Sequence, residues 1–214
     1  MGDGRRVGDE PGPRWIHRRG VLLAARFHPA DGSPPRDALV RLSLTFGWPA
    51  PVPDFVGMGI RLLPDGGDLL LASARMDGDH RLTRSRDVLG CALASGLPCR
   101  VAGADRRVAA VPRDPRLGTL ADLGDGAGVA PAVYDLAART RPGTWEPLGR
   151  LELTGPAPPG TALRLRPPAT PRRWVTPLRR AVYRLSQRPG GAWTRYVPGW
   201  PARWRRPASP GWKR

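Results

Sequence analysis

The stretch "ALVRLSLTF", residues 38–46, alternates between two kinds of side chain. Every second residue from Val40 to Phe46 is apolar, and the positions between them include Arg41, Ser43 and Thr45. Side chains of a β-strand point alternately to its two faces, so a period of two predicts a strand with one buried face. Arg41 and Ser43 would then lie together on the opposite face.

Three apolar runs of similar length flank this stretch. "VLLAARF" (21–27) precedes it, and "FVGMGIRLL" (55–63) and "DLLLASA" (68–74) follow it. Gly57 and Gly59 in the second of these runs indicate a bend or a close backbone approach. The intervening "LPDGGD" predicts a hairpin turn, because proline followed by Asp-Gly favours tight turns. Short strands at this spacing predict an antiparallel sheet or barrel.

The next part of the chain is less regular. Residues 77–96 give no clear pattern, although a helix could begin at Ser85. We expect further strands within residues 99–111 and 146–155 and a last strand at residues 161–168.

One segment near the C-terminus predicts a helix. "WVTPLRRAVYRLSQ" (174–187) has apolar residues at helical spacing, with Thr176 as a cap and Pro177 at the first helical position. Arg179 and Tyr183 are four residues apart and share one face of this helix.

These elements divide the chain into three parts. We expect a disordered arm at residues 1–13, a β-barrel domain at residues 14–187 and a basic tail rich in Pro, Gly, Trp and Arg at residues 188–214. Of the 35 basic residues, 14 follow Leu153 together with no acid, which leaves 21 bases against all 18 acids in the preceding part. The net charge of +17 therefore belongs mainly to the C-terminal segment. Nucleic acid would bind only through that tail.

Several classes of protein are disfavoured. No apolar run is long enough for a membrane span and no signal peptide is evident, so we expect a cytoplasmic protein without membrane contact. Cys91 and Cys99 are too few for a disulfide framework, and with His80 they do not make a zinc site. We expect both thiols to be buried or idle.

Five separated segments resemble the catalase family. "RWIHRRG" (14–20) is similar to the catalase segment that carries the distal histidine, with a basic residue before it and a glycine after it. "VRLS" (40–43), "PDFVGMGIRL" (53–62) and "GGDLLLA" (66–72) resemble the catalase strands that follow, and "RRAVY" (179–183) resembles the motif of the proximal tyrosine. The resemblance is to the minimal, truncated catalase-related branch. It implies a β-barrel of the catalase core type with a C-terminal helix.

The resemblance also implies a distal site for haem b. His17 would accept a proton from peroxide, and Ser43 would bond the other ring nitrogen and fix the tautomer. Arg14 and Arg41 would face the haem propionates, which suit the planar fork of a guanidinium. Arg41 and Ser43 are the two polar residues of their strand that this site needs to point inward together.

For the proximal side of the haem, the resemblance implies residues of the C-terminal helix. Tyr183 would be the fifth ligand of the haem iron, bound as a phenolate. A phenol has a pKa of about 10, so the phenolate needs a cation nearby, and Arg179 lies one helical turn earlier.

One departure from the family concerns catalysis. Catalases pair the distal histidine with an asparagine, and this chain contains no asparagine at all. Ser73 lies at or near the corresponding position, where we expect a structural role. A haem-dependent activity of the peroxidase type is therefore more compatible with the sequence than true catalase activity.

Other interpretations remain open. His17 could be a solvated residue of a basic arm and Tyr183 an ordinary amphipathic helix residue, which would leave a haem-free scaffold or a binder of a small ligand. Peroxide or a small organic molecule is the expected substrate, and a homo-oligomer is compatible with the sequence. We expect His28 and His80 to be exposed.

Overall fold

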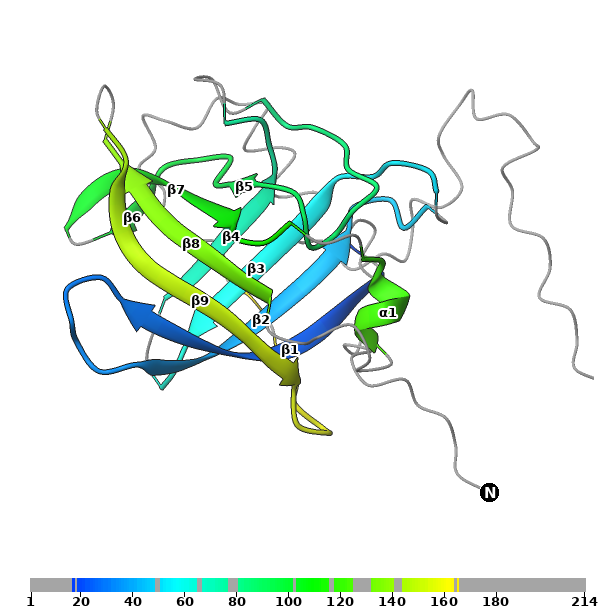
Figure 1. The fold of residues 1–214 in the computed structure, drawn as a ribbon, viewed down its shortest axis with the longest axis horizontal. Helices are drawn as coiled ribbons and strands as arrows, with labels where there is room; N and C mark the ends of the chain where they lie inside the picture. Colours follow the sequence, from blue (N-terminus) through cyan, green and yellow to red (C-terminus); the bar gives the residue numbers. More distant parts are fainter. Residues whose placement is uncertain are drawn as a thin grey trace, which may run out of the picture.

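The computed structural model of the protein is a closed antiparallel β-barrel (Figure 1). It describes residues 17, 19–48, 51–64, 67–76, 81–101, 103–115, 118–124, 132–140, 144–163 and 165. The strands are β1 (Arg19–Pro29), β2 (Arg36–Leu44), β3 (Val56–Leu62), β4 (Asp68–Ser73), β5 (Leu93–Ala94), β6 (Cys99–Val101), β7 (Ala104–Pro112), β8 (Ala132–Arg139) and β9 (Glu146–Pro156).

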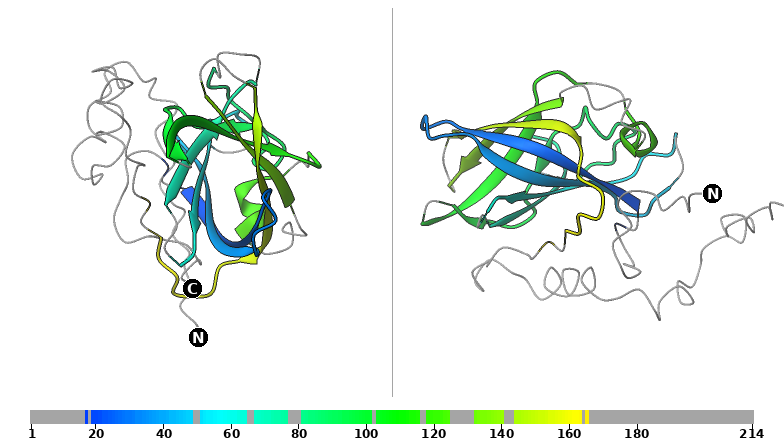
Figure 2. Two further views of the ribbon diagram at one scale, coloured as in Figure 1. Left: turned by 90° about the vertical axis from the view of Figure 1, so that its left-hand side faces the viewer. Right: turned by 90° about the horizontal axis from the view of Figure 1, so that it is seen from below.

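Eight of these strands form the barrel. β1 to β5 pair in sequence, β5 pairs with β7, and β9 returns to pair with β1, so the sheet closes on itself (Figure 2). β6 is an additional strand that pairs with β7. The predicted antiparallel barrel is therefore confirmed, and β3 and β4 pair across the predicted hairpin turn.

The apolar positions of the alternating strands fill the barrel. In β2, Ala38, Val40 and Leu42 are at most 2% exposed and belong to the main core. β8 adds Tyr134, whose hydroxyl donates to the Leu89 carbonyl at 3.0 Å. Removal of this apolar surface from water is the main force that holds the barrel closed.

A second, smaller apolar cluster packs on the outer face of the sheet. Leu22 of β1 lies there with Leu163 and Leu165, which come after β9. Residues 161–163 and 165 form no strand, so the expected last strand is wrong for the residues that the structure describes. Because β9 and β1 close the barrel, this segment meets no free strand edge and instead covers the outer face.

The possible helix that begins at Ser85 is also not formed, so this expectation is wrong. Residues 81–85 run as an extended segment that bridges to Asp54 and Ala74. The Ser85 hydroxyl bonds the backbone of Asp87, and the Asp87 carboxylate accepts the Leu89 amide at 3.0 Å. Such local bonds from serine and aspartate compete with the helical pattern.

The second half of the barrel differs from its expected form in two ways. Residues 99–111 form the hairpin of β6 and β7 rather than one strand, because Gly103 turns the chain with a φ of 76°. β8 was not predicted, although its residues alternate between buried and half-buried positions from Ala132 to Arg139.

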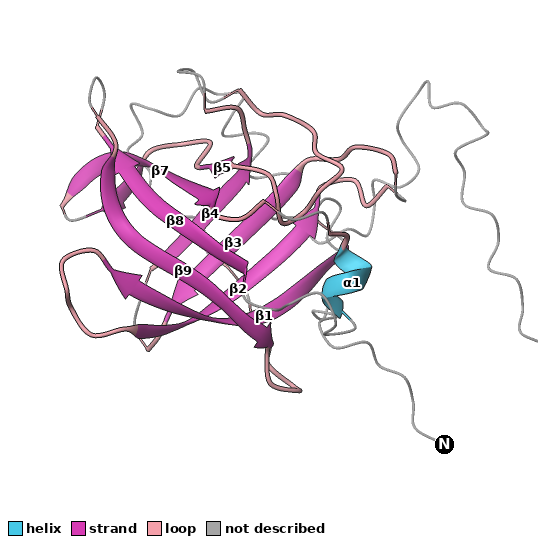
Figure 3. Ribbon diagram, viewed as in Figure 1, coloured by secondary structure: helices cyan, strands magenta, loops and turns pink. Residues whose placement is uncertain are grey.

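Helical structure is sparse in the described residues (Figure 3). The helix α1 (Leu120–Gly124) follows Thr119, whose hydroxyl and amide bond the Asp122 side chain. No helix among these residues is both long and apolar enough to cross a membrane. The arm at residues 1–13, the helix at 174–187 and the tail at 188–214 all lie outside the described residues.

Candidate functional site

His17 is fixed on the outer face of the barrel by its backbone. Its amide donates to the Thr45 carbonyl at 2.8 Å, and its carbonyl accepts a 2.8 Å bond from the Arg41 guanidinium. His17 has a φ of 57°, in the left-handed region that a residue with a Cβ rarely adopts. This conformation costs about 1–2 kcal/mol, and the two backbone bonds hold it.

The imidazole of His17 is oriented by Ser43. The Nδ1 atom lies 3.1 Å from Ser43 Oγ, and that hydroxyl donates onward to the Gly57 carbonyl at 3.4 Å. A hydroxyl has one proton to give, so Ser43 accepts from Nδ1–H. The basic lone pair is then on Nε2, which lies 3.5 Å from the Thr45 hydroxyl oxygen.

A floor of small residues makes room for this ring. In the strand register Ser43 lies opposite Gly20 on one side and Gly57 on the other, and Gly57 lies opposite Ala72. A Cβ added at Gly57 would lie 2.7 Å from His17 Cε1 and 2.9 Å from Nδ1. The expected close approach at Gly57 is therefore an approach of the imidazole to the bare backbone.

The neighbouring row of the sheet carries Arg41. Its side chain is buried, with 7% of the residue exposed, and a Cβ at Gly20 would lie 2.9 Å from the guanidinium carbon. Farther along the same row, Leu165 covers Gly59, where an added Cβ would come within 1.9 Å of the leucine side chain. The outer face thus holds a buried guanidinium between an imidazole and an apolar cover.

The structure brings three of the six predicted site residues together. Arg41 and Ser43 both contact His17, with the expected bond between Ser43 and the imidazole. Arg41 and Ser43 share one face of β2, as predicted, and this face is the outer face of the barrel. Alternation placed the apolar partners Val40 and Leu42 in the interior instead. Arg14, Arg179 and Tyr183 lie outside the described residues.

Ser73 occupies the interior side of β4. Its hydroxyl donates to the Thr83 carbonyl at 2.6 Å and accepts the Val56 amide at 3.0 Å. The residue is fully buried. These bonds give it the expected structural role, and they place it on the face of the sheet opposite to His17.

Sequence reasoning missed Thr45 as part of the site. Its carbonyl and hydroxyl both approach His17. The signal was present in the alternation, because Thr45 continues the polar face that Arg41 and Ser43 begin.

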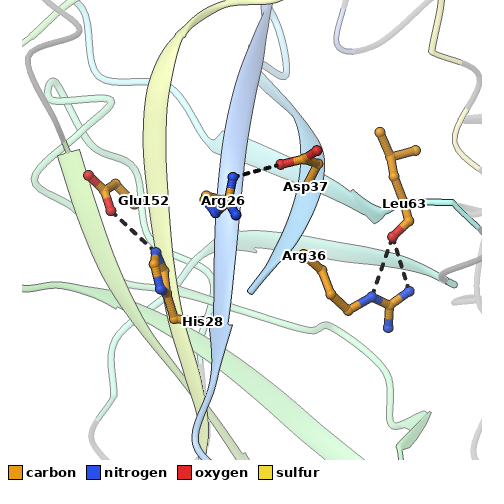
Figure 4. A network of polar contacts seen from close by, with 6 residues as sticks. All are labelled: Arg26, His28, Arg36, Asp37, Leu63 and Glu152. Carbon is orange, nitrogen blue, oxygen red and sulfur yellow. Dashed lines mark hydrogen bonds and ion pairs between the residues drawn. The ribbon is translucent and has the colours of Figure 1, made fainter. Parts of the chain in front are cut away.

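The second described histidine has different surroundings. His28 lies at the other end of β1, where its Nε2 is 3.4 Å from Glu152 Oε2 and its side chain is 29% exposed (Figure 4). It is half-buried rather than exposed as expected. Nearby, Arg26 pairs with Asp37 at 3.5 Å, and Arg36 donates to the Leu63 carbonyl at 3.3 Å.

The cysteines have no role at this site. Cys99 is buried and Cys91 is partly buried, and neither forms a disulfide. Burial raises the pKa of the Cys91 thiol to about 11. The described residues contain no group of three or more His, Cys, Asp or Glu that could hold a metal ion.

The outer face brings together two of the groups that the catalase resemblance implies for a distal haem site, an imidazole and a guanidinium. A flat imidazole lies against a glycine floor, and a buried guanidinium adjoins it. Tyr183, which the resemblance implies as the iron ligand, and Arg179, the cation beside it, are outside the described part. No known family model matches the sequence, and a comparison with curated proteins finds no significant match.

Proposed function

We propose that the protein is a catalase-related haem protein that acts on peroxide with peroxidase-like activity. One observation carries this proposal: His17 is held in a left-handed backbone conformation, with its ring bonded through Nδ1 to Ser43. Residues in such strained conformations concentrate at functional sites, where the surrounding structure maintains them. A histidine that only covered a surface would not need these contacts.

In this proposal His17 is the proton acceptor. Peroxide gives a proton to Nε2, because Nδ1 already carries one that it donates to Ser43. Ser43 and Arg41 are positioning residues, since they hold the ring and the carbonyl of His17. A bound haem would supply an iron that takes up peroxide and changes oxidation state. Tyr183 would ligate that iron with Arg179 beside it, and Arg14 would face a propionate.

The absence of asparagine favours peroxidase-like chemistry. The chain offers no amide partner of this kind to orient peroxide beside His17. Ser73 does not replace it, because its hydroxyl bonds Thr83 and Val56 inside the barrel. Oxidation of a small organic reductant by peroxide requires proton transfer through His17 but no second orienting amide.

The test is the visible absorption spectrum of the full-length protein expressed with haem supplied. We expect a Soret band that Tyr183→Phe removes and His17→Gln retains. In the same preparations, His17→Gln should lower peroxide-dependent oxidation of an organic reductant by about 10²–10⁴-fold, the usual contribution of a general base. Protein that stays colourless with haem present would contradict the proposal.

A second candidate is a haem-free binder of a small ligand. The contact between Leu165 and Gly59 favours it, because the chain itself covers part of the outer face. This candidate predicts that no iron co-purifies and that His17→Gln changes no peroxide-dependent activity.

A further inference from the structure

Three aromatic residues of the loop between β2 and β3 gather with one arginine from the extended segment 81–85. The Phe46 and Trp48 rings stack at 4.9 Å between centroids, and Phe55 lies 6.3 Å from Phe46. The Arg84 guanidinium carbon is 5.1 Å from the Trp48 ring centre and 5.7 Å from that of Phe55. We call Phe46, Trp48, Phe55 and Arg84 the aromatic platform. It is accessible, because Phe46 is 44% exposed and Arg84 is exposed.

Asp54 makes this platform rigid. Its carboxylate is buried and accepts the amides of Phe46 at 3.0 Å, Trp48 at 3.3 Å and Phe55 at 2.7 Å, as well as that of Gly47. Its backbone pairs in both directions with Ser85, next to Arg84. The aromatic loop and the segment that carries Arg84 are therefore both bonded to Asp54. A preorganised surface loses little conformational entropy when a ligand binds.

The exposed charge of the platform is positive. Among the described residues no acidic side chain pairs with Arg84, and the Asp54 charge is satisfied by backbone amides. A guanidinium that lies over aromatic rings uses its flat face there, while its N–H groups point outward in its own plane. Those groups suit a carboxylate, which accepts two parallel bonds from arginine.

We propose that the aromatic platform binds a planar aromatic carboxylate. The carboxylate pairs with Arg84, and the ring packs against the exposed Phe46 and the half-buried Trp48. Residues 153–214 contain no Asp or Glu, so that part of the chain offers Arg84 no acidic side chain.

The platform adjoins the His17 site through Thr45. The Thr45 carbonyl accepts the His17 amide at 2.8 Å, and Phe46 is the next residue. We assign a ligand on the platform the role of the organic co-substrate, because the backbone at Thr45 joins the platform to the His17 site. This role as co-substrate rests on the proposed function, whereas the binding itself does not.

The test is calorimetric titration of the haem-free, full-length protein with 1-naphthoate. We expect Arg84→Gln to weaken binding about tenfold, the effect of one lost charged hydrogen-bond pair. Arg86→Gln is the matched control, because Arg86 is also exposed and lies two residues away, and it should leave binding unchanged. The neutral 1-naphthamide should bind about tenfold more weakly than the carboxylate, and Trp48→Leu should weaken both.

The inference is overturned if naphthoate does not bind, if the amide binds equally well or if Arg84→Gln changes nothing. It is also overturned if sedimentation shows a dimer of the full chain that Phe46→Ser dissociates, because a second copy would then occupy the platform. A missing Soret band with intact naphthoate binding contradicts only the haem proposal. A Soret band without naphthoate binding contradicts only this inference.

Discussion

The two ends of the β1–β2 pair carry polar side chains in opposite circumstances. At one end Arg41 and Ser43 are buried against His17, on a floor that contains Gly57. At the other end Arg26 and Asp37 form an ion pair whose side chains are 52% and 73% exposed. The same two strands thus hold one ordered polar cluster and one solvated polar surface, the latter drawn in Figure 4. Burial, rather than the mere presence of polar residues, distinguishes the candidate site.

The largest expected difference between the two ends comes from their arginines. Arg41→Met should lower the free energy of unfolding by about 2–3 kcal/mol, because it removes a buried charged bond to the His17 carbonyl. Arg26→Met should change it by less than about 0.5 kcal/mol, as surface pairs usually do. Urea unfolding of both variants measures the two values. Equal losses would contradict the distinction between the ends.

The glycine floor should give the next largest effect. Gly57→Ala places a methyl group 2.7 Å from His17 Cε1, and we expect a loss of about 1–3 kcal/mol from overpacking. Gly67→Ala is the control, since no heavy atom lies within 4 Å of a Cβ at that glycine. If both variants unfold alike, the close contact between His17 and Gly57 does not exist in solution.

The Cys91 thiol, which packs against the core and belongs to neither end of the strand pair, should make the stability depend on alkaline pH. Burial raises the pKa of Cys91 to about 11 from an ordinary value of 9.0, so folding favours the protonated thiol. The resulting stabilisation is complete below pH 9 and is lost as the pH rises toward 11. Relative to Cys91→Ala, the protein should lose about 1 kcal/mol between pH 8 and pH 10.

Thermal or urea unfolding of the pair at the two pH values gives this difference directly. A constant gap between the protein and Cys91→Ala would show that Cys91 is accessible to solvent. The gap should be the same in a background of Arg26→Met, since that exposed side chain is remote from the core.

The smallest expected effect is the coupling between Arg26 and Asp37. A double-mutant cycle with Arg26→Met and Asp37→Asn should give at most about 0.5 kcal/mol at low salt. This coupling should vanish in 1 M NaCl, where charges are screened within about 3 Å. The effect of Arg41→Met should not change with salt. A coupling that persists in salt would mean that this end is also buried.

Much of the barrel could be predicted because its strands alternate clearly. The regular pattern at residues 38–46 identified the interior of β2 and also set Arg41 and Ser43 on a common face. β8 was missed because Val133 and Ala137, at its half-buried positions, are as apolar as the buried residues beside them, which weakens the alternation. The segment 161–165 alternates like a strand, but closure of the barrel by β9 and β1 leaves it on the outer face.

The site could be predicted only in part. The resemblance and the alternation together predicted that His17, Arg41 and Ser43 lie close to one another. The left-handed backbone of His17 and the approach of its ring to Gly57 depend on how β1, β2 and β3 align. The aromatic platform depends on Asp54. Its carboxylate binds the loop after β2, and its backbone pairs with Ser85, beside the distant Arg84. Such tertiary contacts leave no periodic trace in the sequence.

The central claim is that the sheet fixes His17 in one protonation form. A long-range ¹H–¹⁵N spectrum of the full-length protein at pH 8, with His17 assigned through His17→Gln, tests it most directly. We predict a single tautomer with the proton on Nδ1, lost in Ser43→Ala, while the ring of the half-exposed His28 is unaffected by that substitution. A His17 ring protonated on Nε2, or one that averages between tautomers as a solvated histidine does, would contradict the account.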